Sequence, residues 1–242
     1  MGNNATVYKT TNAGVSWTQL TAGLGSLTGT VRSVNFVNEN DGWISAQSGQ
    51  IYHTSDGGSN WSAQTSNVSS NHLNSIFFLD NQTGWAVGAN GGITRTTNGG
   101  TSWTGLISPI NTETLRGIHF TDANNGVVVG GDRTIARSTD GGENWAYVSS
   151  VATSNLRAVT FNASQPEKGW IVGDQSQIYK TIDGGATWDS EEHSIIGTLR
   201  SVSVYDTSAV PEPSTYALGF GLLVFGFAAY RRSQAQPSMR IS

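Results

Sequence analysis

Arginine recurs at one position of an internal pattern in this chain of 242 residues. A guanidinium group binds carboxylates and phosphates through two parallel hydrogen bonds. Several such groups around one axis would form a positive patch that binds a carboxylate, a phosphate or an acidic protein loop. The candidate ligand-binding residues are Arg32, Arg116, Arg157 and Arg200, with Asn74 at the same position of the remaining copy. The alternative is that these arginines pair with nearby Asp and Glu and were copied as the pattern duplicated.

A second basic series occupies another position of the same pattern. Its members are Lys9, His53, Arg95, Arg137 and Lys180. Each lies shortly before a turn signal. We expect these side chains to be solvated charges at a sheet edge, where charge discourages pairing between sheets.

Both series belong to an internal repeat. Five stretches align without gaps: "VYKTTNAGVSW" (7–17), "IYHTSDGGSNW" (51–61), "ITRTTNGGTSW" (93–103), "IARSTDGGENW" (135–145) and "IYKTIDGGATW" (178–188). Their closing residues, Trp17, Trp61, Trp103, Trp145 and Trp188, are 44, 42, 42 and 43 residues apart. Two further series lie between them, one typified by "GWAVG" (84–88) and one by "LRGIHF" (115–120).

The repeat predicts an all-β fold. Each period holds three obvious short strands, and a fourth follows each closing Trp. Four short strands in about 40–45 residues are typical of a β-propeller blade, which buries its faces by stacking on neighbouring blades. We therefore expect a propeller over residues 1–206, with four complete blades. Residues 7–20 supply only two last strands and residues 197–206 only a first strand. Together they would form a split or incomplete fifth blade; the alternative is that upstream blades are missing.

The Asx residues of the repeat are predicted to form turns rather than to catalyse. Asp or Asn before Gly, after an alternating strand, is a hairpin signal. The pattern "S/T-x-D/N-x-G-x-x-W" resembles the Asp box of bacterial-neuraminidase-type repeats. The structural Asx residues are Asn12, Asp56, Asn98, Asp140 and Asp183, followed by the five closing tryptophans. Since two of the five are Asn, no carboxylate is required there.

The C-terminal region has a different composition. Pro211, Glu212 and Pro213 precede fifteen uncharged residues (216–230), and Arg231 and Arg232 follow. A helix of fifteen residues spans roughly 22 Å, which is short of a bilayer core of about 30 Å. The paired arginines nevertheless suit a positive-inside stop. We expect a linker over 207–215, a short transmembrane helix over 216–232 and a disordered tail over 233–242.

This ordered arrangement resembles the PEP-CTERM sorting signal of Gram-negative bacteria. The resemblance implies recognition by an exosortase-type enzyme, export, attachment to the membrane through a C-terminal helix, and cleavage near Pro-Glu-Pro. The propeller would then lie in the cell envelope or outside the cell. The N-terminus has no basic start and no apolar run, so it is not a secretory signal. Together with a start inside a blade, this leads us to expect an incomplete N-terminus.

The repeats, through "GWAVG", "T-x-D/N-G-G-x-x-W" and "LRSV", also resemble the propellers of photosystem II assembly and stability factors. In that family the propeller is a scaffold for partner proteins, and a basic patch takes part in binding. The resemblance therefore points to the four arginines named above. The sorting tail argues against a photosystem role. We expect a non-catalytic scaffold that binds a protein or an extracellular polysaccharide.

An enzyme is the alternative class. A sialidase-like glycoside hydrolase needs three Arg to clamp a carboxylate, a Tyr–Glu nucleophile pair and an acid Asp. Here Tyr8, Tyr52 and Tyr179 are repeat positions rather than singular ones. Glu191, Glu192 and His193 form an acidic loop, which we interpret as a solvated turn.

Composition argues against several other functions. The chain has no Cys, which excludes disulfides and thiolate metal sites. Its four His are scattered, and no phosphate-binding loop or Ser-His-Asp order is present, so we expect neither a metal nor a cofactor. A net charge of -4 gives no reason to expect nucleic acid as a partner.

Overall fold

The computed structural model describes residues 6–68, 72–106, 109–110, 112–149 and 151–204. This part is all-β and contains four antiparallel sheets of four strands each. The first two sheets are β3 (Val31–Phe36), β4 (Gly42–Ala46), β5 (Ile51–Thr54), β6 (Ser62–Gln64) and β7 (Leu73–Phe78), β8 (Gly84–Gly88), β9 (Ile93–Thr96), β10 (Thr104–Leu106). The next two are β11 (Leu115–Phe120), β12 (Gly126–Gly130), β13 (Ile135–Ser138), β14 (Ala146–Tyr147) and β15 (Leu156–Phe161), β16 (Gly169–Gly173), β17 (Ile178–Thr181), β18 (Asp189–Ser190).

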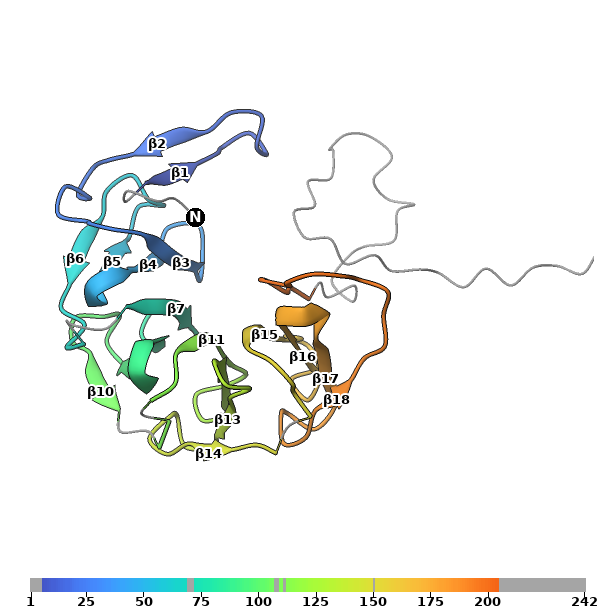
Figure 1. The fold of residues 1–242 in the computed structure, drawn as a ribbon. Helices are drawn as coiled ribbons and strands as arrows, with labels where there is room; N and C mark the ends of the chain where they lie inside the picture. Colours follow the sequence, from blue (N-terminus) through green and yellow to red (C-terminus); the bar gives the residue numbers. More distant parts are fainter. Residues whose placement is uncertain (1–5, 69–71, 107–108, 111, 150, 205–242) are drawn as a thin grey trace, which may run out of the picture.

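The four sheets are successive meanders, as expected for propeller blades. Within each sheet every strand pairs with the next along the chain. The first strands of neighbouring sheets contact one another: β3 meets β7, β7 meets β11, and β11 meets β15. Figure 1 shows the sheets as an arc with these strands on its inner side and β6, β10, β14 and β18 on its outer side. The four complete predicted blades are therefore present, with the arginine-bearing strands innermost.

The turn of each repeat is closed by its own side chains. In the first complete sheet, the Asp56 carboxylate accepts hydrogen bonds from Thr54 Oγ1 and from the backbone and side chain of Asn60, all at 2.8 Å. The Gly58 N–H donates to Thr54 Oγ1 at 2.8 Å. Asn60 contributes most to lowering the pKa of Asp56 to about 2. The same network recurs at Asn12, Asn98, Asp140 and Asp183.

Aromatic side chains join each sheet to the next. Trp43 of β4 stacks on Phe78 of the following sheet at 3.6 Å between ring centroids, and Trp85 stacks on Phe120 at the same separation. Phe78 in turn meets the closing Trp103 edge-on at 5.7 Å. At the third junction Val127 stands where Trp43 and Trp85 stand, and it lies in one buried cluster with Phe161. The core is thus a row of interfaces between sheets.

A directed hydrogen bond accompanies every junction. The carbonyl of the first turn glycine accepts a bond from the preceding sheet each time: Gly57 from Lys9 Nζ, Gly99 from Trp43 Nε1, Gly141 from Trp85 Nε1 and Gly184 from Arg137 Nε. These bonds are 2.6, 3.2, 2.8 and 3.0 Å long. Lys9 and Arg137 belong to the second basic series. The prediction that this series consists of solvated edge charges is therefore wrong for these two residues, because they bridge adjacent sheets.

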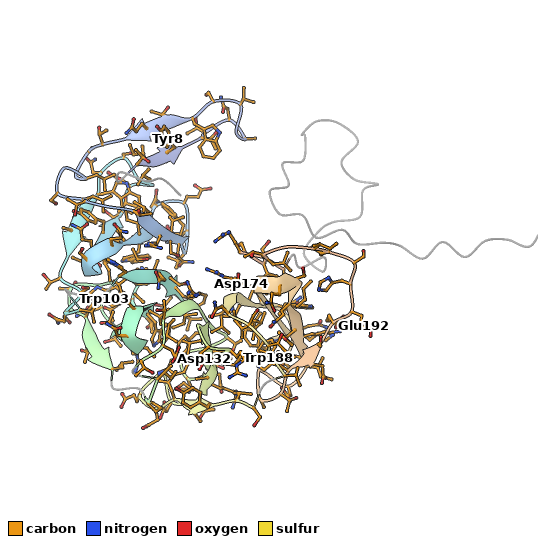
Figure 2. All side chains as sticks on the ribbon, viewed as in Figure 1. Tyr8, Trp103, Asp132, Asp174, Trp188 and Glu192 are labelled. Carbon is orange, nitrogen blue, oxygen red and sulfur yellow. The ribbon has the colours of Figure 1, made fainter. Side chains whose placement is uncertain are left out.

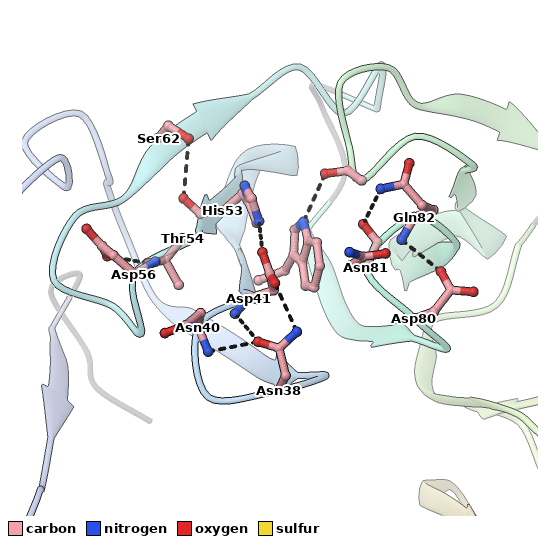
Figure 3. Close-up of polar contacts among 12 residues, drawn as sticks. Asn38, Asn40, Asp41, His53, Thr54, Asp56, Ser62, Asp80, Asn81 and Gln82 are labelled. Atoms are coloured by element: carbon pink, nitrogen blue, oxygen red, sulfur yellow. Dashed lines mark hydrogen bonds and ion pairs between the residues drawn. The ribbon is translucent and has the colours of Figure 1, made fainter.

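His53 departs from the other members of that series. Its ring stacks on Trp43, and its Nε2 lies 3.6 Å from Asp41 Oδ1. Figure 3 shows this pair beside the loop of Asn38 and Asn40. Burial lowers the pKa of His53, although the Asp41 carboxylate acts in the opposite direction. The first complete sheet thus carries a neutral ring where its neighbours carry cations.

The two ends of the described chain do not join into one sheet. At one end β1 (Val7–Lys9) and β2 (Thr18–Leu20) pair only with each other. At the other end residues 199–204, predicted to be a strand, are not part of any strand, although the Leu199 N–H donates to the Gly173 carbonyl at 2.9 Å. Among the described residues, no strand pairs with both β1 and residues 199–204.

Several predictions lie outside the described residues. They are the linker 207–215, the sorting helix 216–232, the tail 233–242, and the motif residues Pro211, Glu212, Pro213, Arg231 and Arg232. Within the part of the chain that the structure describes, no helix has the length and apolarity to span a membrane.

Candidate functional site

Three arginines of the first series, Arg32, Arg116 and Arg157, each stand at an irregularity of their strand. The pairing register of β3 with β4 shifts between Val31 and Ser33, on either side of Arg32. The same shift occurs around Asn74, Arg116 and Arg157 in the next three sheets. A bulge leaves one residue out of the ladder and re-aims its side chain. The repeat therefore presents this position differently from its strand neighbours.

Two other arginines of the series lie within electrostatic range of Arg116. Burial contributes most to lowering the pKa of Arg116, followed by the positive charge of Arg157. The charge of Arg32 acts in the same direction, and Asp174 opposes it. Arg32, Arg116 and Arg157 thus form one positive face, which we call the arginine face.

Asp174 neutralises one member of the arginine face. It begins the short 3-10 turn η3 (Asp174–Ser176), directly after β16. Arg157 donates to both of its carboxylate oxygens, Nε to Oδ1 at 2.8 Å and Nη2 to Oδ2 at 2.7 Å. Hydrogen bonding from Arg157 contributes most to lowering the pKa of Asp174 to about 2. In Figure 2, Asp174 lies on the side of its sheet that faces the middle of the arc.

Arg116 and Arg32 have no such partner. Among residues 6–68, 72–106, 109–110, 112–149 and 151–204, neither forms an ion pair. Their Nε atoms are buried and make no hydrogen bond within the same part of the chain. A partly buried guanidinium without a counter-ion favours an external anion, because part of the desolvation cost of its charge is already incurred.

The remaining members of the series behave differently. Asn74 donates from Nδ2 to the Leu115 carbonyl at 2.8 Å, which ties β7 to β11. Arg200 is exposed and follows the last sheet. Three of the four candidate arginines are thus related through Arg116, whereas Arg200 is not among the charges that shift the pKa of Arg116.

The arginine face provides cations that can hold an anion. Two of the three repeated tyrosines are engaged elsewhere: Tyr52 Oη lies 2.7 Å from Ser26 Oγ, and Tyr179 Oη donates to Gln177. The third, Tyr8, is 52% exposed. Glu191 lies 3.6 Å from Lys180 Nζ. No group of three or more His, Asp and Glu side chains that could hold a metal ion occurs in the residues that the structure covers. The site is suited to binding an anion.

Asp174 was not identified from the sequence. Its equivalents in the other repeats are Gln47, Ala89 and Gly131, so a carboxylate at this position occurs in one copy only. A residue that departs from its repeat can indicate function, and the alignment of the repeats already shows this departure at Asp174.

No protein-family model matches this chain, and no curated protein matches it. Among solved structures, YCF48 bound to D1 peptide is 18% identical over 67% of this chain and 82% of its own, with a TM-score of 0.49. An ancestral GH74 enzyme is 19% identical over 66% of this chain, with a TM-score of 0.55. The GH74 xyloglucanase from Xanthomonas campestris is 12% identical over 88% of it, with a TM-score of 0.56.

The two GH74 structures support the fold alone. The match covers 24% and 36% of their respective chains. Together with the four antiparallel sheets, these similarities indicate a β-propeller-like fold of four-stranded blades.

Proposed function

We propose that this chain is a non-catalytic binding scaffold that holds an acidic partner on the arginine face. The observation that carries the proposal is that Arg116 shares its surroundings with Arg157 and Arg32 but has no carboxylate partner of its own in the described residues. Removing such a group from water is costly, and a bound carboxylate offsets that cost through charge-assisted hydrogen bonds.

The partner is a protein with an acidic segment, or an acidic extracellular polysaccharide. The resemblance of the repeats to photosystem II assembly and stability factors supports a scaffold that holds a protein. Because Asp174 already neutralises Arg157, the face carries about two net positive charges. It is therefore suited to one or two carboxylates rather than to a polyanion such as nucleic acid.

A sialidase-like glycoside hydrolase is the second candidate. The approach of three arginines supports it, since a carboxylate clamp in such an enzyme uses three. The engagement of Tyr52 and Tyr179 in other hydrogen bonds argues for the scaffold instead. Release of dye from a panel of fluorogenic sialosides, abolished by Arg116→Ala, would favour the hydrolase.

The location of the scaffold is part of the proposal. Pro211, Glu212, Pro213, Arg231 and Arg232 would form a sorting signal that an exosortase-type enzyme recognises. The scaffold would be exported, with a C-terminal membrane anchor. Mass spectrometry of the protein from a cell envelope fraction tests this, because processing near Pro213 would remove the last 29 residues.

Binding of defined acidic probes tests the scaffold. We expect hexaglutamate to bind the full chain with an affinity that falls in 0.5 M salt. Arg116→Ala should weaken binding by about tenfold, and adding Arg157→Ala should weaken it further. Arg133→Ala, which removes an exposed charge outside the series, is the matched control. Equal affinity of the Arg116 and Arg133 variants, for hexaglutamate and for polygalacturonate, would refute the proposal.

A further inference from the structure

A polar groove of about 510 Å³ lies between the first complete sheet and the second. On one side it is lined by Asp41, His53 and the outer strand β6, and on the other by the loop of Asn81 and Gln82 and the turn at residues 98–101. Figure 3 shows this loop across from Asp41 and His53. The groove is thus a feature of two complete sheets, and none of its lining residues belongs to the arginine face.

Three lining residues of the first complete sheet depart from the repeat: Asp41, His53 and Gln64. Asp41 precedes the second strand, and its backbone carbonyl accepts the same loop hydrogen bond as the carbonyls of its counterparts. The counterparts in the other copies are Thr83, Asn125 and Lys168 for Asp41, Lys9, Arg95, Arg137 and Lys180 for His53, and Leu20, Leu106, Val148 and Glu191 for Gln64. Three departures that meet in one groove give this junction a chemistry of its own.

At each of the other three junctions, a basic side chain at the position of His53 reaches the sheet that follows. Arg95 Nη1 lies 3.7 Å from a carboxylate oxygen of Glu143, which belongs to the turn of the next sheet. Arg137 donates from Nη2 to Asn125 Oδ1 at 3.3 Å, and Asn125 is the counterpart of Asp41. A cation beside this acceptor position is therefore part of how the repeats join.

His53 does not supply that cation. Its ring stacks on Trp43, and its Nε2 lies 3.6 Å from Asp41 Oδ1, which is longer than a hydrogen bond. Burial lowers the pKa of His53, so the ring is neutral at pH 7. Asp41 Oδ2 accepts from Asn38 Nδ2 at 2.9 Å, whereas Oδ1 accepts no hydrogen bond from the residues that the structure describes. The groove thus has an open carboxylate oxygen, and no Lys or Arg is among its described lining residues.

Gln64 keeps the groove polar and fixes its floor. Its Nε2 donates to the Gly99 carbonyl at 2.9 Å, and its Oε1 accepts from Trp103 Nε1 at 3.2 Å. Three of its counterparts are apolar and pack against the hydrophobic clusters of their own junctions: Leu20, Leu106 and Val148. Because these hydrogen bonds already hold the wall in place, a ligand that enters the groove has little of the protein to order.

We propose that this groove binds a guanidinium group of another molecule, which takes the role that Arg95 and Arg137 have at their own junctions. The guanidinium donates to Asp41 Oδ1 and lies along the His53 ring. A guanidinium suits this place better than an ammonium, because its planar fork matches a carboxylate and stacks on ring faces. Its source is an arginine of a protein or a free guanidino compound. The inference does not depend on the arginine face, and it gives the scaffold a second docking site of opposite charge.

Nuclear magnetic resonance of the full chain in mild detergent tests the site directly. The probe is the peptide acetyl-Gly-Arg-Gly-amide, and saturation transfer to its Arg side-chain protons measures binding. Since the chain has only four His, the ring signal of His53, assigned by its loss in His53→Asn, reports where the probe binds. We expect saturable binding with a shift of this signal. The same peptide with citrulline, which is similar in shape but uncharged, should show neither.

Two substitutions that the repeat itself tolerates should remove the binding. Asp41→Asn, which places there the residue found at Asn125, should weaken binding by about fivefold. His53→Arg restores the cation of the other copies, so it should fill the groove from within and abolish binding while the chain stays folded in urea unfolding. Asp132→Asn removes an exposed carboxylate outside the groove and should leave the affinity unchanged.

The outcomes distinguish the sources of the group and the failure of the inference. Tighter binding of the peptide than of agmatine would assign the site to a protein arginine, and the reverse to a free guanidino compound; both support the inference. Equal binding of the arginine and citrulline peptides would indicate a neutral polar ligand and overturn it. Absence of saturable binding, or unchanged binding in Asp41→Asn and His53→Arg, would also overturn it. Arg116→Ala should leave this binding unchanged, so the inference and the proposed function can fail independently.

Discussion

Trp43 and Phe78 come from different sheets, yet their rings stack at 3.6 Å with only 8° between their planes. Trp43 is fully buried, and its indole N–H reaches the turn of the sheet to which Phe78 belongs. One side chain thus provides both the apolar and the polar contact of a junction. The stability of each blade therefore depends on the blade beside it as well as on its own strands.

Replacing Trp43 should be costly. We expect Trp43→Ala to lower the free energy of unfolding by about 3–5 kcal/mol, because it opens a cavity between two sheets and leaves the Gly99 carbonyl with only its Gln64 contact. Trp17→Ala is the matched control, since Trp17 is 57% exposed and should contribute less than about 1 kcal/mol. Urea unfolding at equilibrium measures both, and similar losses would contradict this account of the junctions.

Gly88 should tolerate no side chain. A Cβ atom there would lie 1.9 Å from the His72 carbonyl oxygen, so the backbone would have to move. We expect Gly88→Ala to lower the free energy of unfolding by about 2–3 kcal/mol. The steric clash is the whole cause, because the extended backbone of Gly88 is one that any residue can adopt. Gly105→Ala, where nothing lies within 4 Å, should be neutral or slightly stabilising. Thermal unfolding of the pair would test the close approach of β8 to the preceding segment.

His119 should make stability depend on pH. Its ring lies 4.7 Å from Phe77 and 5.5 Å from Phe161, and burial lowers the pKa of His119 to about 4. The unfolded chain, with a His pKa of about 6.5, binds this proton first. Stability should therefore fall as the pH drops from 6.5 to 4, by on the order of 2–3 kcal/mol. His119→Gln should remove this component from the pH profile of urea unfolding, and an unchanged profile would exclude it.

Asp174 should restrain the arginine face. Asp174→Asn removes the carboxylate that Arg157 holds through two hydrogen bonds, so the net positive charge of the face rises by one. We expect hexaglutamate to bind this variant severalfold more tightly at pH 7 and low salt, with a steeper loss of affinity as salt is added. Asp132→Asn removes an exposed carboxylate beside Arg133 and serves as the control. A gain of the same size in both variants would indicate a general charge effect only.

The blades could be predicted because their signal is repeated and local. The spacing of the closing tryptophans and the Asx-Gly turns gave the four-stranded meanders and the inner position of the Arg116 strand. The expected strand at residues 199–204 is absent, because a strand needs a hydrogen-bonding neighbour as well as a suitable pattern. Local sequence cannot specify that neighbour.

The arrangement of charges was harder to predict. The bulges at Arg32, Arg116 and Arg157 depend on how two strands align, which the alternation of a single strand does not reveal. Lys9 and Arg137 were expected to be solvated, but they reach carbonyls some 48 and 47 residues away. Such contacts arise between sheets, and the sequence of one repeat contains no information about the distance to the next.

The bonds to the turn glycines all run in one direction, from each sheet to the one that follows it. The row of sheets therefore has a direction: each repeat donates a hydrogen bond on one side and accepts one on the other. A repeat inserted between two neighbours would find an acceptor for its donor and a donor for its turn carbonyl, without any change in the other repeats. Chains with this construction can gain or lose whole repeats by duplication or deletion, and only the two terminal units need adapt.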